Sequence, residues 1–236
     1  MIRLNKHLKD CGYCSRREAD RWIAEGLVKV NGVIETTLGI TIDPEKDTVE
    51  IQGKDIQEKQ EEKVYLVLNK PKGYVTTMKP TSVEKNIVID LVPREPRVFP
   101  VGRLDKDTTG MLILTNDGLL ANQLTHPSFE HEKEYEVKVE KPLTPGQIEK
   151  LESGLRLWGE KTKPTQVHKL SSHVFRIILQ EGKNRQIRRI CRKVGNDVVE
   201  LKRVRVGRLW MPELKEGEYR GLSEEEVKYL IISSSE

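Results

Sequence analysis

The sequence is poor in aromatic residues, has few cysteines and contains no long apolar run. Aromatic side chains make up only 5% of the 236 residues, so positions able to stack on a flat ligand are few. Apolar stretches such as residues 66–68 and 230–232 are far too short to cross a bilayer. The first residues carry no apolar signal segment, and three cysteines cannot all pair as in a secreted chain. These absences predict a protein of the reducing cytoplasm with no membrane partner.

The sequence also lacks the motifs that bind common cofactors. It contains no Walker loop and no GxGxxG stretch. Cys11 and Cys14 form a CxxC pair, but Cys191 is the only further cysteine and no histidine pair follows them at the distance found in zinc fingers. We therefore predict no metal and no small-molecule cofactor, and we expect Cys11 and Cys14 to be small buried thiols.

Charge is abundant and unevenly distributed. The 41 lysines and arginines exceed the 37 acidic residues only slightly, giving a net charge of +4. Between residues 181 and 208, however, ten basic residues face three acidic ones, a local net charge of +7. Such a field attracts a polyanion such as RNA, although an ordinary solvated face could have the same composition.

Composition divides the chain near residue 60. The polar stretch of residues 54–63 lacks strand periodicity and is typical of a linker or a surface excursion. We predict a small unit over residues 1–60, linker included, and a larger unit over residues 61–236. In the small unit, helices are expected at residues 4–11 and 15–25, followed by two short strands around an Asn31-Gly32 turn.

The larger unit is predicted to have many strands and few helices. Strands are expected at residues 64–71, 98–104, 111–115, 134–139, 174–179 and 198–206. Helices are expected at residues 119–124, 144–154 and 186–194, and from residue 223 onward. Because strands and helices do not alternate regularly, the pattern favours an α+β fold. No heptads or long apolar edges indicate a fixed dimer, so we expect a monomer.

The start of the second helix is a candidate phosphate site. Ser15 is placed to cap this helix, and Arg16 and Arg17 follow it directly. Helix starts offer unpaired backbone N–H groups and a partial positive charge, and arginines add charge-assisted donors. Arg3 and Lys6 on the preceding helix could extend the patch. An ordinary capped surface helix remains the alternative.

The stretch RLNKHLKDCGYCSRREADRWIAEGLVKVNG is more specific than this physics, because it resembles the S4 RNA-binding module over nearly its full length. The resemblance implies a small αα-turn-β unit that grips structured RNA. It also implies a set of RNA-contacting side chains, namely Arg3, Asn5, Lys6, Ser15, Arg16, Arg17 and Lys29.

A polar loop of residues 102–110 lies between two predicted apolar strands. Loops at strand ends expose side chains to ligands, but a solvated loop with local ion pairs would look the same. The stretch GRLDKDTTGMLILTNDG resembles the signature of the RsuA-type pseudouridine synthases, the bacterial ribosomal enzymes that carry an S4 module. HEKEYEVKV and EGKNRQIRRIC resemble two further motifs of that family. The similarity runs from about residue 3 to residue 230 and is strongest to the subgroup called the F type, which acts on 23S rRNA.

The resemblance implies a catalytic domain built on a mixed, mostly antiparallel sheet with flanking helices. It implies that Asp105 is the nucleophile, that Tyr135 is the catalytic tyrosine, and that Arg188 pairs with Asp105. A neighbouring guanidinium would keep such a carboxylate ionised. Tyr135 could stack on an extruded base, while Arg103 could fill the space that the base leaves. Phosphate contacts are expected from Lys183, Arg185 and Arg189.

The implied reaction isomerises a uridine of ribosomal RNA to pseudouridine, with 23S rRNA or a pre-ribosomal particle as the favoured partner. It needs no redox step, in keeping with the absence of cofactor motifs. Asp105 could attack C1′ of the ribose or act at its 2′ position, and the sequence favours neither route. The same chemistry on 16S rRNA or tRNA and a non-catalytic rRNA-binding assembly role are the alternatives.

Overall fold

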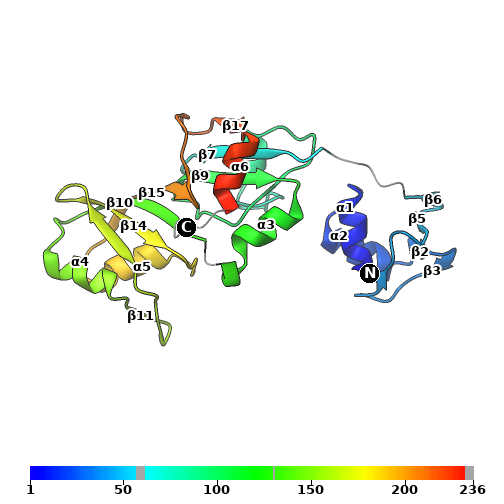
Figure 1. Ribbon diagram of the computed structural model, residues 1–236, viewed down its shortest axis with the longest axis horizontal. Coiled ribbons are helices and arrows are strands. Elements are labelled where there is room, and N and C mark those ends of the chain that lie inside the picture. The colour runs from blue at the N-terminus through cyan, green and yellow to red at the C-terminus, as the bar shows by residue number, and fades with distance from the viewer. Residues whose placement is uncertain (57–61, 130, 232–236) are drawn as a thin grey trace. The chain divides into compact units, whose positions relative to one another are not determined.

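The computed structural model describes residues 1–56, 62–129 and 131–231, and the chain divides into two compact units, residues 1–62 and 63–236. The predicted boundary between residues 60 and 61 and half of the predicted linker, residues 57–61, lie outside the described residues. Each unit has its own buried core (Figure 1).

In the N-terminal unit, two helices pack on small β-structure. The helices are α1 (Leu4–Asp10) and α2 (Arg16–Ala24), and they lie side by side in Figure 1. The strands are β1 (Ile2–Arg3), β2 (Val28–Val30), β3 (Val33–Ile34), β4 (Thr41–Ile42), β5 (Val49–Ile51) and β6 (Lys54–Asp55). β1 pairs with β4, and the others form a sheet in the order β3-β2-β5-β6. The predicted strands at the Asn31-Gly32 turn are confirmed, whereas β4, β5 and β6 were not predicted.

Cap chemistry sets where α2 begins. The hydroxyl of Ser15 accepts a hydrogen bond from the backbone N–H of Glu18 at 3.2 Å, as the sequence predicts. Leu4, Leu8, Ala19 and Ile23 then turn inward at helical spacing and form the core with Val28. Cys11 and Cys14 are both buried, as expected.

The larger unit is built on one nine-stranded sheet. Seven strands follow in the order β13-β14-β10-β15-β9-β7-β17, while β8 pairs with β9 and β16 with β15. Every pairing is antiparallel except that between β15 and β9. The predicted α+β class, with a mixed and mostly antiparallel sheet, is therefore confirmed. The strands are β7 (Tyr65–Lys70), β8 (Phe99–Pro100), β9 (Thr109–Thr115), β10 (Lys133–Val139), β13 (Gln166–Lys169), β14 (Val174–Leu179), β15 (Val198–Val206), β16 (Leu209–Trp210) and β17 (Tyr219–Gly221).

Helices cover the two halves of this sheet. Helices α4 (Pro145–Glu152) and α5 (Gln186–Lys193) share a buried core with β10 and β14. Helices α3 (Gly118–Thr125) and α6 (Glu224–Ile231) share a second core with β7 and β9. Short 3₁₀ turns η1 (Val88–Leu91) and η2 (Pro127–Phe129) and the hairpin of β11 (Arg156–Leu157) and β12 (Glu160–Lys161) complete the unit.

Two sequence predictions in this unit need correction. The strand predicted at residues 98–104 is shortened to β8, because Gly102 adopts a φ of +70° and turns the chain into the polar loop. The region of residues 156–169 was not assigned any strands, yet it contains β11, β12 and β13. These strands are two to four residues long, and buried and exposed positions do not alternate regularly along them. The sequence therefore carries little strand periodicity there.

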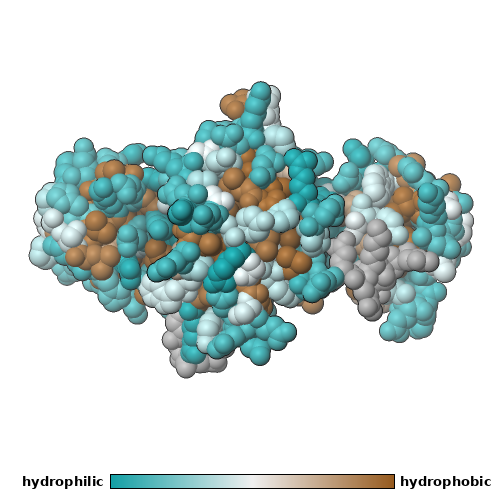
Figure 2. Space-filling view, turned by 90° about the horizontal axis from the view of Figure 1, so that it is seen from above, coloured by the Kyte–Doolittle hydropathy of each residue, from teal (hydrophilic) through white to brown (hydrophobic). Residues whose placement is uncertain are grey.

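The surface is mainly hydrophilic, with scattered apolar patches in the view of Figure 2. Within the described residues, every helix is too short or too polar to cross a bilayer.

The parallel contact of β9 with β15 depends on a glycine. Gly110 pairs with Arg203 across this contact, and a Cβ at Gly110 would lie 2.3 Å from the carbonyl oxygen of Arg203. Its φ of +98° also disfavours any other residue. The approach of the two strands therefore requires glycine at this position.

We expect Gly110→Ala to lower the free energy of unfolding by about 3 kcal/mol or more, from the combined backbone strain and overpacking. Gly217→Ala is the matched control, since Gly217 has a φ of +87° but open space around its Cα. It should lose only the strain, about 1 kcal/mol. Urea unfolding of the two variants measures this difference, and equal losses would contradict a steric role for Gly110.

Candidate active site

The loop that carries Asp105 is fixed by backbone and side-chain hydrogen bonds. The N–H of Thr108 donates to the carbonyl of Asp105 at 3.1 Å, which closes a turn. The hydroxyl of Thr76 donates to the carbonyl of Leu104 at 2.8 Å, and the N–H of Gly73 donates to the carbonyl of Lys106, also at 2.8 Å. The loop therefore holds one conformation directly before β9.

Lys70, at the end of β7, forms the strongest anchor of this loop. Its side chain is fully buried, and its Nζ donates to the carbonyls of Pro71, Lys106 and Thr108 at 3.0, 3.3 and 2.9 Å. Burial lowers the pKa of Lys70 to about 8, although the charges of Asp107 and Asp105 oppose the shift. One ammonium thus satisfies three carbonyls around the candidate nucleophile.

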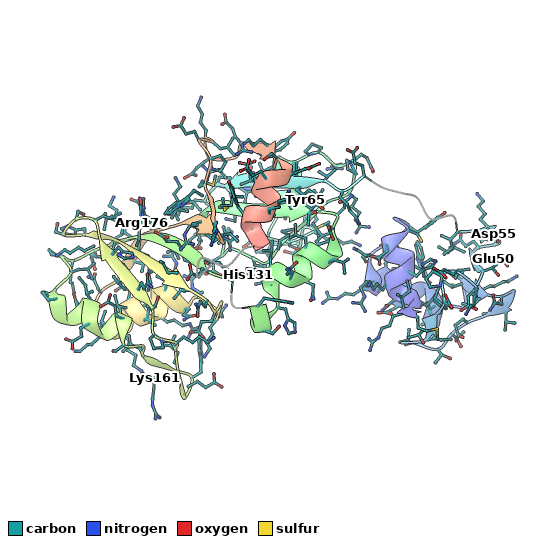
Figure 3. The ribbon with its side chains drawn as sticks, in the orientation of Figure 1. Glu50, Asp55, Tyr65, His131, Lys161 and Arg176 are labelled. Atoms are coloured by element: carbon teal, nitrogen blue, oxygen red, sulfur yellow. The ribbon has the colours of Figure 1, made fainter. Side chains whose placement is uncertain are left out.

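A cavity of about 820 Å³ opens beside the loop. Its walls come from the loop, from β10 and β15, and from the segment that leads into α5. His131 also lines it and lies between α5 and α3 in the view of Figure 3. The polar and charged residues that line it include Arg103, Asp105, Tyr135, Lys133, Lys163, Lys183, Arg185 and Arg203. A nucleotide fits a space of this size and charge.

Asp105 faces an arginine, but a different one from that predicted. Its Oδ2 lies 3.7 Å from Nη1 of Arg185, and Nη2 of the same residue lies 3.1 Å from Oδ2 of Asp107. Burial raises the pKa of Asp107, but the hydrogen bond and charge of Arg185 and the charge of Arg188 outweigh burial, so the pKa is lowered. Arg185 therefore bridges both carboxylates of the loop.

The fork-like pair predicted between Arg188 and Asp105 is not the arrangement observed. Arg188 instead donates through Nη1 to the carbonyl of Val198 and through Nη2 to the carbonyl of Asp107, at 3.2 and 3.0 Å. The cause lies in the backbone before α5. Arg185 adopts a left-handed conformation with φ +50° and ψ +32°, which lets a residue outside the helix reach the loop.

Tyr135 lies on β10, where alternation places it on the same strand face as Lys133. Both side chains line the cavity, and Arg203 of β15, the partner of Tyr135 in the strand pairing, lines it too. Burial and the charge of Arg203 lower the pKa of Lys133 to about 8, and its Nζ donates to the carbonyl of His131 at 2.9 Å. The cavity thus combines a carboxylate, a phenol and several cations.

The residues predicted to contact RNA in this unit occupy different places. Arg103 is exposed at the cavity wall, and Lys183, which also lines the cavity, pairs with Glu160 at 3.0 Å and with Glu181 at 3.7 Å. Arg189 lies outside the cavity wall, with its guanidinium 4.5 Å from the ring centre of Trp158. Their contacts with RNA stay predictions.

In the N-terminal unit, three of the predicted RNA contacts have structural partners: Ser15, which caps α2, and Asn5 and Arg16. Nδ2 of Asn5 donates to Asp20 at 2.8 Å, and Arg16 donates to Oδ1 of Asn5 at 3.3 Å. Asn5 is buried, so it is better placed to orient Arg16 than to contact a ligand directly. Arg3 and Arg17 are exposed, while Lys6 and Lys29 are half-buried.

Sequence reasoning missed Lys70, Lys133 and Arg203. Lys133 could have been found, because it stands two residues before Tyr135 on an alternating strand. Lys70 carried a weaker signal, a lysine that ends an otherwise apolar strand just before a proline. Nothing local distinguishes Arg203 from Arg205, the other arginine of β15.

Comparison with known proteins agrees with this geometry. Residues 64–193 match the family described as RNA pseudouridylate synthase, and residues 2–49 match the S4 domain. The chain is 41% identical over 240 residues to the dual-specificity RNA pseudouridine synthase RluF of Escherichia coli K12, covering all of this chain and 81% of that protein. It is 40% identical over 238 residues to ribosomal large subunit pseudouridine synthase B of Bacillus subtilis 168, covering 98% of this chain and 96% of that protein.

A solved structure titled as a pseudouridylate synthase superposes with a TM-score of 0.71 at 30% identity, covering 98% of this chain and all of that one. The fold and the site thus define an RNA-modifying isomerase with an accessory RNA-binding module. The chain belongs to the RNA pseudouridylate synthase family and is a pseudouridine synthase.

The different partners of the two arginines predict different losses of stability. Arg188→Gln should lower the free energy of unfolding by about 1–3 kcal/mol, because buried carbonyls lose charged donors. Arg185→Gln should cost less than about 1 kcal/mol, because its ion pairs are exposed to water. Urea titrations measure both values, and a larger loss for Arg185→Gln would refute the assignment of their roles.

Lys70 should matter for both stability and turnover. Lys70→Met keeps the apolar stem but leaves three carbonyls without a donor, so we expect the free energy of unfolding to fall by about 2–4 kcal/mol. We also expect a reduced kcat, because the loop shifts. Lys72→Met is the control, because Lys72 is exposed on the same segment. It should change neither the urea midpoint nor kcat, and equal effects of the two substitutions would contradict the anchoring role.

Proposed function

We propose that this protein isomerises a specific uridine of 23S rRNA to pseudouridine and that Asp105 is its nucleophile. The arrangement that carries the proposal is the carboxylate of Asp105 on an anchored loop at the wall of a nucleotide-sized cavity, facing Arg185. The Bacillus subtilis relative, which is named for the large ribosomal subunit, supports ribosomal RNA as the substrate class. As no heptads or apolar edges indicate a partner, we further propose that it acts as a monomer.

The reaction breaks the C1′–N1 bond, rotates the uracil and joins C5 to C1′. Asp105 attacks C1′ or acts at the 2′ position, while N1 gains a proton and C5 loses one. Arg185, with Nη1 3.7 Å from Oδ2 of Asp105, orients that carboxylate beside the ribose. In this scheme Arg188 acts as a positioning residue, because it holds the backbone of Asp107 from the other side.

Tyr135 and Lys133 face the extruded uracil. The ring of Tyr135 stacks on the base, and its hydroxyl lies on the route by which the proton leaves C5. Lys133, with a pKa of about 8, donates to a carbonyl oxygen of the uracil or to a phosphate. Arg103, exposed at the rim, fills the gap left in the RNA stack and offsets part of the unstacking energy.

The decisive variant is Asp105→Asn, which removes the charge but keeps the shape. Release of tritium from C5-labelled uridine in 23S rRNA should fall by at least about 10³-fold, with RNA affinity unchanged. Asp107→Asn serves as the comparison and should retain measurable turnover, since Asp107 supports Arg185 without being the nucleophile. Full turnover by Asp105→Asn would refute the assignment.

The RNA substrate is tested separately. Pseudouridines are mapped in 23S rRNA, 16S rRNA and tRNA from a strain that lacks the protein and from its parent. We expect the loss of one 23S rRNA pseudouridine, restored by the wild-type gene but not by the Asp105→Asn gene. A loss confined to 16S rRNA or tRNA would reassign the substrate but not the chemistry.

A further inference from the structure

An exposed tryptophan stands at the tip of the β11–β12 hairpin, outside the cavity already described. Trp158 and Gly159 form the two-residue turn between Leu157 and Glu160. Both turn residues have a positive φ, +51° for Trp158 and +86° for Gly159. This is the conformation of a type I′ turn, whose first position favours asparagine, aspartate or glycine.

A tryptophan is a poor choice for that turn on conformational grounds alone. Bulky residues rarely adopt a positive φ, and such strain tends to persist where a side chain is needed for function. Burial does not explain the residue either, because 56% of its surface remains exposed. The side chain is therefore exposed to solvent even though its backbone conformation is unfavourable for tryptophan.

The ring is held in place from one side. The guanidinium of Arg189, on α5, lies over it at 4.5 Å from the ring centre. Nζ of Lys193 donates to the carbonyl of Arg156 at the base of the hairpin, and Nζ of Lys183 pairs with Glu160 at 3.0 Å. The hairpin is thus tied to the helix whose N-terminal side borders the cavity.

Most charged residues on the elements next to the tryptophan are basic. Six exposed cations lie on the hairpin, two residues after it and on α5, namely Arg156, Lys161, Lys163, Arg189, Arg192 and Lys193. Over residues 156–163 and 186–193, Glu160 is the only acidic residue in the sequence. Lys161 points away from the body of the unit in Figure 3. An aromatic face among cations is the chemistry that binds a nucleotide base and its phosphates.

We propose that Trp158 and Arg189 form a stacking platform for an unpaired base of the substrate RNA, close to the target uridine. This inference rests on RNA being the substrate. Lys163 and Lys183 both line the catalytic cavity and connect the platform to it. Lys163 stands two residues after β12, and Lys183 pairs with Glu160 of β12. An RNA strand lying on the platform can therefore pass Lys163 and Lys183 on its way to the cavity that Asp105 borders.

The chain offers a matched control in Trp210. This residue is 48% exposed and also lies near arginines, with Arg176 at 5.3 Å and Arg205 at 5.7 Å from its ring. Arg205 donates a hydrogen bond to Glu134. Because side chains alternate along a strand, Glu134 lies on the other face of the sheet from its neighbour Tyr135. Figure 3 shows Arg176 and Lys161 on opposite sides of this half of the unit. Trp210 thus reproduces the chemistry away from the cavity.

The test measures the binding of a full-length 23S rRNA transcript by the intact protein at several salt concentrations. Trp158→Ala should weaken binding about 10-fold, Trp158→Phe should stay within about twofold of wild type because its ring still stacks, and Trp210→Ala should bind like wild type. The salt dependence should be the same for all, because no phosphate contact is lost. Wild-type affinity of Trp158→Ala, or equal losses for both alanine variants, would overturn the platform.

A second readout needs no catalysis. In the variant Trp22→Phe/Trp210→Phe, Trp158 is the only tryptophan, and stacking of a base should quench its fluorescence when the transcript is added. Unchanged fluorescence with bound RNA would overturn the platform. Failure to bind any RNA would overturn both the platform and the proposal that RNA is the substrate. Neither result touches the role of Asp105, which the tritium assay with Asp105→Asn decides on its own.

Discussion

The architecture of the catalytic unit depends on one buried ammonium. Lys70 ends β7 inside the protein, where a charge is costly unless its hydrogen bonds are met. Three carbonyls of the surrounding loops meet them, and in doing so they fix the loop that carries Asp105. A carboxylate beside a ribose must be placed within fractions of an ångström to be useful. The burial of Lys70 supplies that precision, because the loop cannot move without stranding either the ammonium or its acceptors.

The same strand ends also set the second wall of the site. β9 is paired with β7 on one side and with β15 on the other, and Gly110 faces Lys70 in the first pairing and Arg203 in the second. Because glycine lets the parallel pair close, Arg203 comes to line the cavity that Asp105 borders. The two halves of the sheet, each with its own helices and core, thus meet at the site. A substrate bound at this junction contacts residues from both halves of the sheet, and neither half has to change its fold.

Much of this could be predicted from the sequence, and the failures have physical causes. Long periodic segments such as β10 and β14 were predicted well, since burial on one face imposes alternation. Short strands such as β11 and β12 were missed, because two residues cannot show a period. The pairing of Asp105 was assigned to the wrong arginine, because nothing in the local sequence signals the positive φ of Arg185 that brings its side chain to the loop. Lys70 was missed for a related reason: its role exists only once loops distant in sequence converge on it.

The distribution of arginines in and before α5 shows how one basic motif serves several tasks. Arg185 lies before the helix and reaches the loop carboxylates, Arg188 lies one turn on and faces the core side, and Arg189 turns outward to Trp158. Helical geometry separates neighbouring side chains by about 100°, so consecutive arginines cannot share a target. A run that looks like a single RNA-binding stripe is therefore divided among charge stabilisation, backbone anchoring and surface recognition. Net charge alone could not have revealed this division, because the three roles differ only in direction.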